Sequence, residues 1–153
     1  MKKDLFAIFA IRPITDKKRF YLLSFSWGLL MNLAGAMVAV FMLVTGHRMR
    51  RFGPCFYFEH GEGWGGMDWG CVIVVNKGAG SHLLSHELGH AMQNCRFGPF
   101  MPLLVGIPSA LRYRFRQLYT RISGRQPKKP YDAIWFEGQA TRIGQEYLKL
   151  TRS

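Results

Sequence analysis

The feature that most constrains this chain is an apolar segment from Phe20 to Gly46 that contains no charged residue. About 20 apolar residues are enough to cross the hydrocarbon core of a bilayer. A buried soluble helix of this length without a single charge would be unusual. The segment therefore predicts a transmembrane helix over residues 20–46. A core helix of a larger assembly is the open alternative.

The residues on either side of this segment favour an uncleaved anchor over a cleaved signal peptide. A basic lead, residues 1–19, precedes the segment, and the sequence HRMRR at 47–51 stands where a cleavage site would have small residues. Because both flanks are basic, they do not define an orientation. The many basic residues between 112 and 129 favour a cytoplasmic body. We therefore expect an integral protein of the cell membrane with a cytoplasmic catalytic domain.

The charge of the chain indicates which partners it can attract. The 153 residues carry a net charge of +12, with 21 Lys and Arg against 9 Asp and Glu. Near a membrane, such charge favours anionic lipid headgroups. No nucleic-acid-binding motif accompanies it, so no nucleic-acid partner is expected. Cys55, Cys71 and Cys95 are odd in number and form no CxxC pair, which argues against a disulfide framework and against a cysteine zinc site.

The chain beyond the apolar segment predicts one small α+β domain over residues 52–150. Residues 52–60 and 71–76 have the composition of strands, and a glycine-rich loop separates them. Ser81 is the expected N-cap of a helix from about 82 to 96, and residues 131–150 predict a last helix. The strand at 72–75 is either an edge to which an extended peptide adds or a plain core strand.

A second uncharged segment, residues 97–111, contains prolines at 99, 102 and 108. It is short for a membrane span, and the prolines disfavour a straight helix. We expect a membrane-associated segment that is re-entrant or interfacial. A kinked second span and a buried linker remain open.

The sequence HELGH at 86–90 is the strongest functional signal in the chain. Positions i and i+4 of a helix share one face, so His86 and His90 can bind one metal ion. Glu87 lies about 100° further around the helix, where it can reach a water without binding the metal. This is the geometry of H-E-x-x-H zinc hydrolases, in which the metal polarises water and the glutamate moves its proton. The plain alternative is a surface helix with two solvated histidines.

Two histidines need a third protein ligand, with water in the fourth position. The extended motif with a third histidine is excluded, because Gln93 and Arg96 occupy its glycine and histidine positions. The downstream acids are Asp132, Glu137 and Glu146. Glu137 is favoured because the small residues around it allow two helices to meet closely around an ion. A carboxylate in such apolar surroundings requires a cation, and an arginine is the alternative to a metal.

This combination of HELGH and a glutamate on a later helix resembles the gluzincin metallopeptidases, of which thermolysin is the familiar member. The resemblance implies that zinc is bound by His86, His90 and Glu137, with Glu87 as the general base. Residues 65–144 also resemble a set of uncharacterised bacterial membrane proteins. Those proteins combine HELGH, GIPS and WFE motifs, which stand here at 86–90, 106–109 and 135–137.

The chain departs from the gluzincin pattern in two ways. Thr141 stands where thermolysin-like enzymes have an aspartate that supports a ligating histidine. A hydroxyl can still hydrogen-bond to the ring, but it raises the basicity of the ligand less. The residue that would stabilise an oxyanion has no clear match, and the candidates are Tyr113, Tyr131, Tyr147 and Arg142.

Together, these features predict a membrane-anchored zinc metallopeptidase that cleaves a peptide or a membrane-proximal protein. Its expected α+β fold is an N-terminal transmembrane helix followed by a small zincin-like domain, with short strands, an HExxH helix and a C-terminal glutamate helix. Two alternatives remain. The first is a non-catalytic scaffold or regulator with a structural metal site at HELGH. The second is a basic membrane-surface adaptor without a metal.

Overall fold

The computed structural model describes residues 11–152 and has the expected α+β architecture. One sheet contains β1 (Arg50–Phe52), β2 (Cys55–Glu59), β3 (Gly66–Trp69) and β4 (Val72–Val75) in the order β1-β2-β4-β3. β2 and β4 are parallel, and the other neighbours are antiparallel. The first ten residues of the expected basic lead lie outside the described part of the chain.

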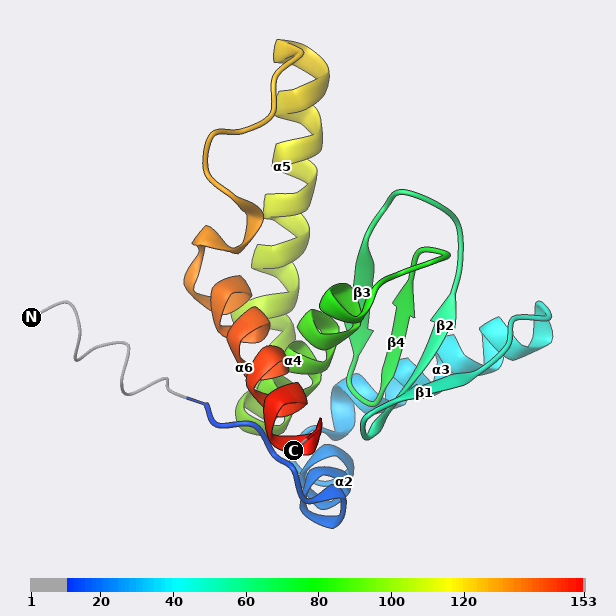
Figure 1. Cartoon of the computed structure of the whole chain (residues 1–153). Coiled ribbons are helices and arrows are strands. Elements are labelled where there is room, and N and C mark those ends of the chain that lie inside the picture. Colours follow the sequence, from blue (N-terminus) through cyan, green and yellow to red (C-terminus); the bar gives the residue numbers. More distant parts are fainter. Residues whose placement is uncertain (1–10, 153) are drawn as a thin grey trace, which may run out of the picture.

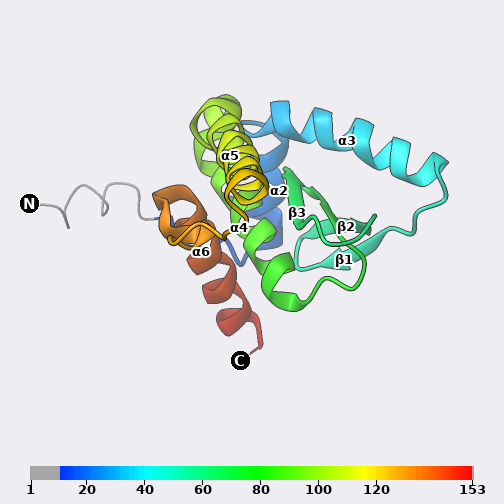
Figure 2. The ribbon, with the colours of Figure 1, turned by 90° about the horizontal axis from the view of Figure 1, so that it is seen from above.

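Helices cover both faces of this sheet (Figures 1 and 2). The α-helices of the described residues are α2 (Lys17–Phe25), α3 (Leu29–Val44), α4 (Ser81–Phe97), α5 (Ile107–Ser123) and α6 (Trp135–Arg152). α3 covers one face and α4 the other. Successive side chains of β4 point to opposite faces of the sheet, and each face is covered by one helix. Val72 and Val74 pack with residues of α3, whereas Ile73 and Val75 pack with α4. α6 then packs on α4 and completes the core.

The strands and the first helix of this domain differ from the predictions in detail. The expected strand 52–60 is divided into β1 and β2, because Gly53 adopts a positive φ of 58° in the turn between them. β4 lies between β2 and β3, so it is a core strand and not an edge; the edge strands of this sheet are β1 and β3. α4 starts at Ser81 itself, and its N-cap is Gly80, without a side-chain hydrogen bond.

The segments around residues 97–130 are mostly helical. A 3₁₀ turn at Gly98–Phe100 and a π-helix at Pro102–Gly106 lead directly into α5. The expected last helix begins with a separate 3₁₀ turn at Tyr131–Ala133, and α6 follows it.

The transmembrane helix expected over residues 20–46 is not supported by the structure. The segment is divided into α2 and α3, which meet at an angle of 95°. Within residues 11–152, no single helix is both long enough and apolar enough to cross a membrane, and α2 and α3 meet those criteria only as a bent pair.

A buried asparagine explains the bend between α2 and α3. The Asn32 side-chain amide donates to the carbonyl oxygens of Ser24 (2.8 Å) and Gly28 (3.0 Å). Its side-chain oxygen accepts a hydrogen bond of 2.8 Å from the backbone N–H of Cys71, next to the β3–β4 turn. These bonds satisfy backbone groups that the break exposes, and they attach the start of α3 to the sheet.

Gly35 lets α3 lie directly on the edge strand. A β-carbon at this position would overlap the carbonyl oxygen of Trp69, so any larger residue pushes the helix away from β3. We predict that Gly35→Leu lowers the free energy of unfolding by about 2–3 kcal/mol, because overpacking against a backbone atom cannot be relieved by a rotamer change.

Ala36→Leu is the matched control, since Ala36 is the next residue on the exposed side of α3. Urea unfolding in a mild detergent, followed by tryptophan fluorescence, measures both variants. Equal midpoints for the two variants would contradict the close contact between α3 and β3.

Candidate metal centre

The candidate site is built where α4 and α6 cross at very short distance. A β-carbon at Gly89 of α4 would overlap the carbonyl oxygen of Ala140, and a β-carbon at Gly144 of α6 would overlap that of Ser85. The absence of a side chain at Gly89 therefore admits the backbone of α6. This contact positions the first turn of α6 beside the HELGH turn of α4.

Three potential metal ligands converge at this crossing. The Oε2 atom of Glu137 lies 3.1 Å from Nε2 of His86 and 3.1 Å from Nε2 of His90. The two Nε2 atoms lie 3.2 Å apart, and the three ligand atoms fall within 4.8 Å of one another. Glu137 is the only one of the three downstream acids in this group, since Asp132 and Glu146 are exposed. Its ion-pair partners among the described residues are the two histidines rather than an arginine.

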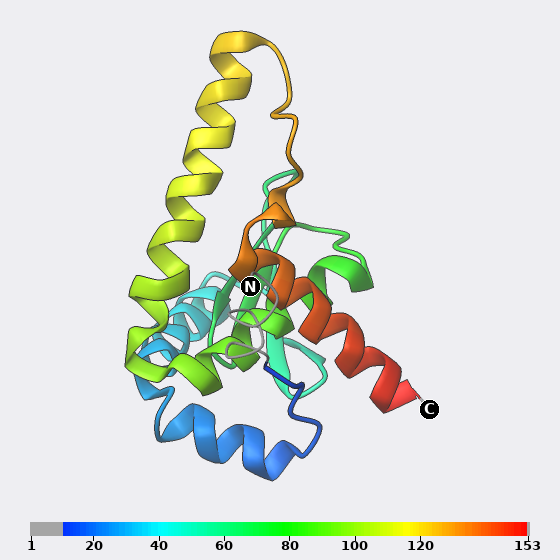
Figure 3. The same ribbon diagram turned by 90° about the vertical axis from the view of Figure 1, so that its left-hand side faces the viewer.

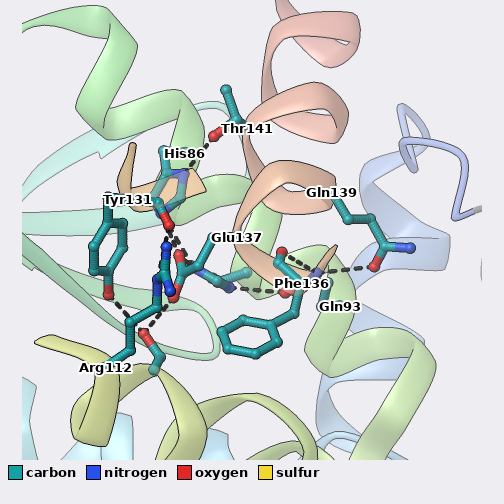
Figure 4. A network of polar contacts seen from close by, with 10 residues as sticks. His86, Gln93, Arg112, Tyr131, Phe136, Glu137, Gln139 and Thr141 are labelled. Carbon is teal, nitrogen blue, oxygen red and sulfur yellow. Dashed lines mark hydrogen bonds and ion pairs between the residues drawn. The ribbon is translucent and has the colours of Figure 1, made fainter. Parts of the chain in front are cut away.

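The opposite nitrogen of each imidazole is held by a side chain of the surrounding helices. Thr141 Oγ1 lies 2.8 Å from Nδ1 of His86, so the contact predicted for Thr141 is present (Figure 4). Gln93 Oε1 lies 2.8 Å from Nδ1 of His90. The Gln93 amide in turn donates to the carbonyl oxygen of Phe136 on α6. Both Nδ1 atoms form hydrogen bonds with these side chains, and both Nε2 atoms face Glu137. A metal-ligating histidine has the same arrangement, in which the ring nitrogen that does not bind the metal is hydrogen-bonded.

Sequence reasoning missed Gln93, whose contact with His90 depends on a local spacing of three residues. It also missed Ser109, the last residue of the GIPS motif. Ser109 Oγ donates to Oε1 of Glu137 and lies 2.9 Å from the Tyr131 hydroxyl. Oε2 of Glu137 therefore contacts the two histidines, and Oε1 accepts a hydrogen bond from Ser109. The GIPS motif was the available signal, but its partner on α6 is far away in sequence.

The structure separates the four candidates for stabilising an oxyanion. Tyr113 and Tyr131 line the cavity above the histidines. Tyr147 is buried in the hydrophobic core, and Arg142 is exposed on α6 outside the cavity. Burial, with the nearby charge of Glu137 as the next cause, raises the pKa of Tyr131 to about 12. Tyr131 therefore carries its proton at neutral pH and can donate a hydrogen bond.

Glu87 lies beside the ligand group without belonging to it. Its side chain is buried, and a β-carbon at Gly66 of β3 would meet the Glu87 carboxylate. Burial raises the pKa of Glu87, while the charges of His90 and His86 partly oppose the rise. A glutamate with a raised pKa next to a cavity has the basicity that proton transfer near neutral pH requires.

Buried carboxyl groups lie close to the histidines. Burial tends to raise the pKa of Glu137, but hydrogen bonds from His86 and His90 bring that pKa below its usual range. Burial also raises the pKa of Asp68 on β3, and neither of its carboxylate oxygens has a hydrogen-bond partner. Among the described residues, no Lys or Arg side chain is buried that could neutralise these carboxylates.

The donor set fits a divalent metal ion. Two imidazole nitrogens and one carboxylate oxygen are the protein ligands of many catalytic zinc sites, and other divalent ions accept the same donors. The ligands line a cavity of about 860 Å³, to which β3, α3, α4, α5 and the start of α6 contribute. A metal ion held there would be open to the cavity on one side.

Comparison with known proteins adds no further assignment. No known protein family matches the chain, and neither a curated protein nor a solved structure matches it. The functional interpretation therefore rests on the residues and geometry of the site itself.

Thr141 provides the first test of the metal site. We predict that Thr141→Val lowers the affinity for zinc about 10-fold to 100-fold, because it removes the hydrogen bond that orients the His86 ring. Competition with a fluorescent chelator measures the change. Thr151→Val is the matched control, since Thr151 donates to the Tyr147 carbonyl near the far end of α6. Equal affinities for the two variants would contradict the supporting role of Thr141.

The metal-free protein should lose stability as the pH rises from neutral. Burial alone would lower the pKa of His90, but the hydrogen bond and charge of Glu137, with Glu87 and Asp68, raise it from 6.5 to about 9. The folded state therefore holds this proton more tightly than the unfolded chain does. The resulting stabilisation is complete below pH 6.5 and is lost as the pH passes through about 9.

Thermal unfolding in a chelating buffer at pH 6, 7.5 and 9 tests this behaviour. We expect the melting temperature to fall across the series for the wild type and to vary much less for His90→Gln. An equally steep fall in His90→Gln would show that another group carries the pH dependence.

Proposed function

We propose that this protein is a metal-dependent peptidase, with zinc held by His86, His90 and Glu137 and with Glu87 as the general base. One observation carries the proposal. The three ligand atoms converge at the wall of a cavity, while a fourth side chain, that of Glu87, lines the same cavity without joining the group. This arrangement is the one expected from the gluzincin resemblance, and it supports a catalytic role over a purely structural one.

In this proposal, Glu87 transfers one proton in two steps. Bound zinc would supply a Lewis acid that polarises a water molecule and the carbonyl of the substrate. Glu87 takes the proton of the attacking water and later gives it to the leaving amine. Thr141 and Gln93 hold the two imidazoles in orientation, and Ser109 holds Glu137. Tyr131 and Tyr113 remain the two candidates for donating to the developing oxyanion.

The edge strand β3 supports a peptide as substrate. β3 contributes to the wall of the cavity and pairs with β4 on one side, and no strand of the described residues pairs with its other edge. An extended peptide that adds to this edge would place its carbonyl groups above the histidines. We therefore propose that an extended peptide adds to β3 and not to the strand at 72–75.

The proposed enzyme acts at the cell membrane, with its cavity on the cytoplasmic side. The apolar segment of α2 and α3 supports the membrane attachment, and the excess of basic residues supports the cytoplasmic side. The second candidate function is a non-catalytic protein with a structural metal site. Structural zinc sites have four protein ligands, whereas three converge here among the described residues, which favours the enzyme.

Metal content and cleavage together test the proposal. We expect about one zinc per chain in the purified wild type and in Glu87→Gln, but none in His86→Ala or Glu137→Ala, measured by elemental analysis. Cleavage of a proteome-derived peptide library, read by mass spectrometry, should fall about 10²-fold to 10⁴-fold in Glu87→Gln, because only the base is removed.

Each failure has a distinct meaning. A wild type without metal at neutral pH in chelator-free buffer would overturn the proposal and favour the basic membrane adaptor. A metal-loaded wild type that cleaves nothing would favour the structural site. Equal cleavage by wild type and Glu87→Gln would remove Glu87 from the role of base.

A further inference from the structure

Two helices present large apolar side chains that are mostly exposed in the described part of the chain. Six side chains, three on α3 and three on α5, are each more than half exposed. They recur at intervals of three or four residues, so each set forms one stripe along its helix. We call these stripes together the apolar face: Leu33, Met37 and Val40 of α3, and Leu111, Phe115 and Leu118 of α5.

Both stripes point to the same side of the molecule. α3 packs on the sheet through Gly35 and Met42, which lie on the opposite side of the helix from Met37. α5 turns Ser109 and Tyr113 towards the metal site and the loop before β3, so its apolar stripe points away from them. Figures 2 and 3 place α3 and α5 along one side of the molecule, outside the sheet, α4 and α6.

An aromatic pair joins the two stripes. Trp27, at the bend before α3, lies with its ring centre 6.4 Å from that of Phe100, in the turn that leads to α5. Both rings are about half exposed, and the Trp27 indole nitrogen donates to the carbonyl oxygen of Arg96. Exposed aromatic rings with a polar anchor are typical of residues at the interface between lipid and water.

Positive charge borders the stripe on α5. Arg114 lies three positions after Leu111, and Arg121 lies three positions after Leu118, so both flank the apolar side chains. Both arginines are exposed, and no described carboxylate lies within ion-pair distance of either. An apolar stripe bordered by arginines is the pattern of a helix that lies in the headgroup region of an anionic leaflet.

We propose that the apolar face docks this protein onto one anionic leaflet, with α3 and α5 lying in the plane of the membrane rather than crossing it. The charge argues for lipid as the occupant, because the chain carries +12 overall and arginines border the face itself. The extent of the apolar face also argues for lipid as the occupant. Each helix extends about 25 Å along the surface, and the two helices lie in different directions, so the face is broad. Docking explains an apolar segment that is bent and still exposes most of its large side chains.

The docked position also defines which substrates can reach the metal site. Met31 of α3 and Ile107 and Ala110 of α5 line the cavity, so the helices that form the apolar face also form a wall of the cavity. In the docked state only the layer formed by α3 and α5 separates the cavity from the membrane surface. The substrate class is therefore a membrane-proximal peptide segment. This last step rests on the proposed function, whereas the docking itself does not.

Binding to vesicles tests the docking. The full chain, freed of detergent, is mixed with vesicles of phosphatidylcholine and phosphatidylglycerol in a ratio of 7 to 3, and bound protein is measured by flotation. We expect Met37→Gln/Val40→Gln and Leu111→Gln/Phe115→Gln each to weaken binding at least 10-fold, because two of the three side chains of one stripe no longer gain from leaving water. The matched control is Met49→Gln, an exposed apolar residue outside the face, which should bind as the wild type does.

The contribution of charge is tested separately. Arg114→Gln and Arg121→Gln should each weaken binding about 5-fold on the anionic vesicles and leave binding to pure phosphatidylcholine unchanged. Arg142→Gln on α6 is the matched control and should change neither. Unfolding midpoints equal to that of the wild type verify that every variant is folded.

Labelling decides whether α2 and α3 lie in the membrane or cross it. Cys55, Cys71 and Cys95 are buried, so single cysteines introduced as Lys17→Cys, Arg48→Cys and Lys128→Cys can be labelled selectively. In right-side-out and inverted membrane vesicles from the expressing cells, a membrane-impermeant maleimide should reach all three positions from the same side. Labelling of positions 17 and 48 from opposite sides would overturn in-plane docking.

Two further results would also overturn the proposal. Wild-type protein that ignores anionic vesicles would remove lipid as the occupant. Glutamine variants that dissociate a dimer in sedimentation, while vesicle binding stays unchanged, would assign the apolar face to a second copy of the chain. His86→Ala should dock as the wild type does, so a failure of the metal site and a failure of the docking remain distinguishable.

Discussion

The close crossing of α4 and α6 is the contact on which the candidate site depends. The histidines belong to α4 and the glutamate to α6, so the distance between the two helix axes decides whether one carboxylate reaches both rings. Glycines on both helices, Gly89 and Gly144, each face a carbonyl oxygen of the other helix and leave no room for a side chain. A crossing separated by ordinary side chains would leave the Glu137 carboxylate too far from at least one imidazole.

The crossing also buries a dense set of polar groups, and most of them are paired. Glu137 is fully buried, yet its two oxygens contact His86, His90 and Ser109. Such pairing offsets the cost of removing a carboxylate from water, which would otherwise exclude it from a protein interior. Asp68 departs from this rule, because both of its oxygens are buried without a hydrogen-bond partner. Two imidazoles and one carboxylate within reach of one another form a group that could bind a divalent metal ion.

The apolar segment at the start of the chain serves the same centre indirectly. Asn32 and Gly35 attach α3 to the β3–β4 turn, and β3 in turn forms the wall of the cavity opposite α5. In the proposed docked state, the outer side of α3 contacts lipid while its inner side supports the edge strand. One helix would then couple membrane attachment to the shape of the substrate site, because its two sides have different partners.

The sequence by itself determined the parts of this protein that depend on local spacing. The i, i+4 histidines and the place of Glu87 beside them follow from helical periodicity. The choice of Glu137 required only that small residues let two helices meet closely, whereas Thr141 was indicated by the gluzincin resemblance alone. Tertiary structure alone decided the bend at residues 26–28, the edge position of β3 and the contact of Ser109 with Glu137. Each of these depends on residues far apart in the chain, such as Asn32 and Cys71, whose hydrogen bond leaves no trace in hydropathy. A uniform apolar run looks the same whether it is one straight helix or two helices at an angle, because hydropathy records composition and not the backbone partners that a fold supplies.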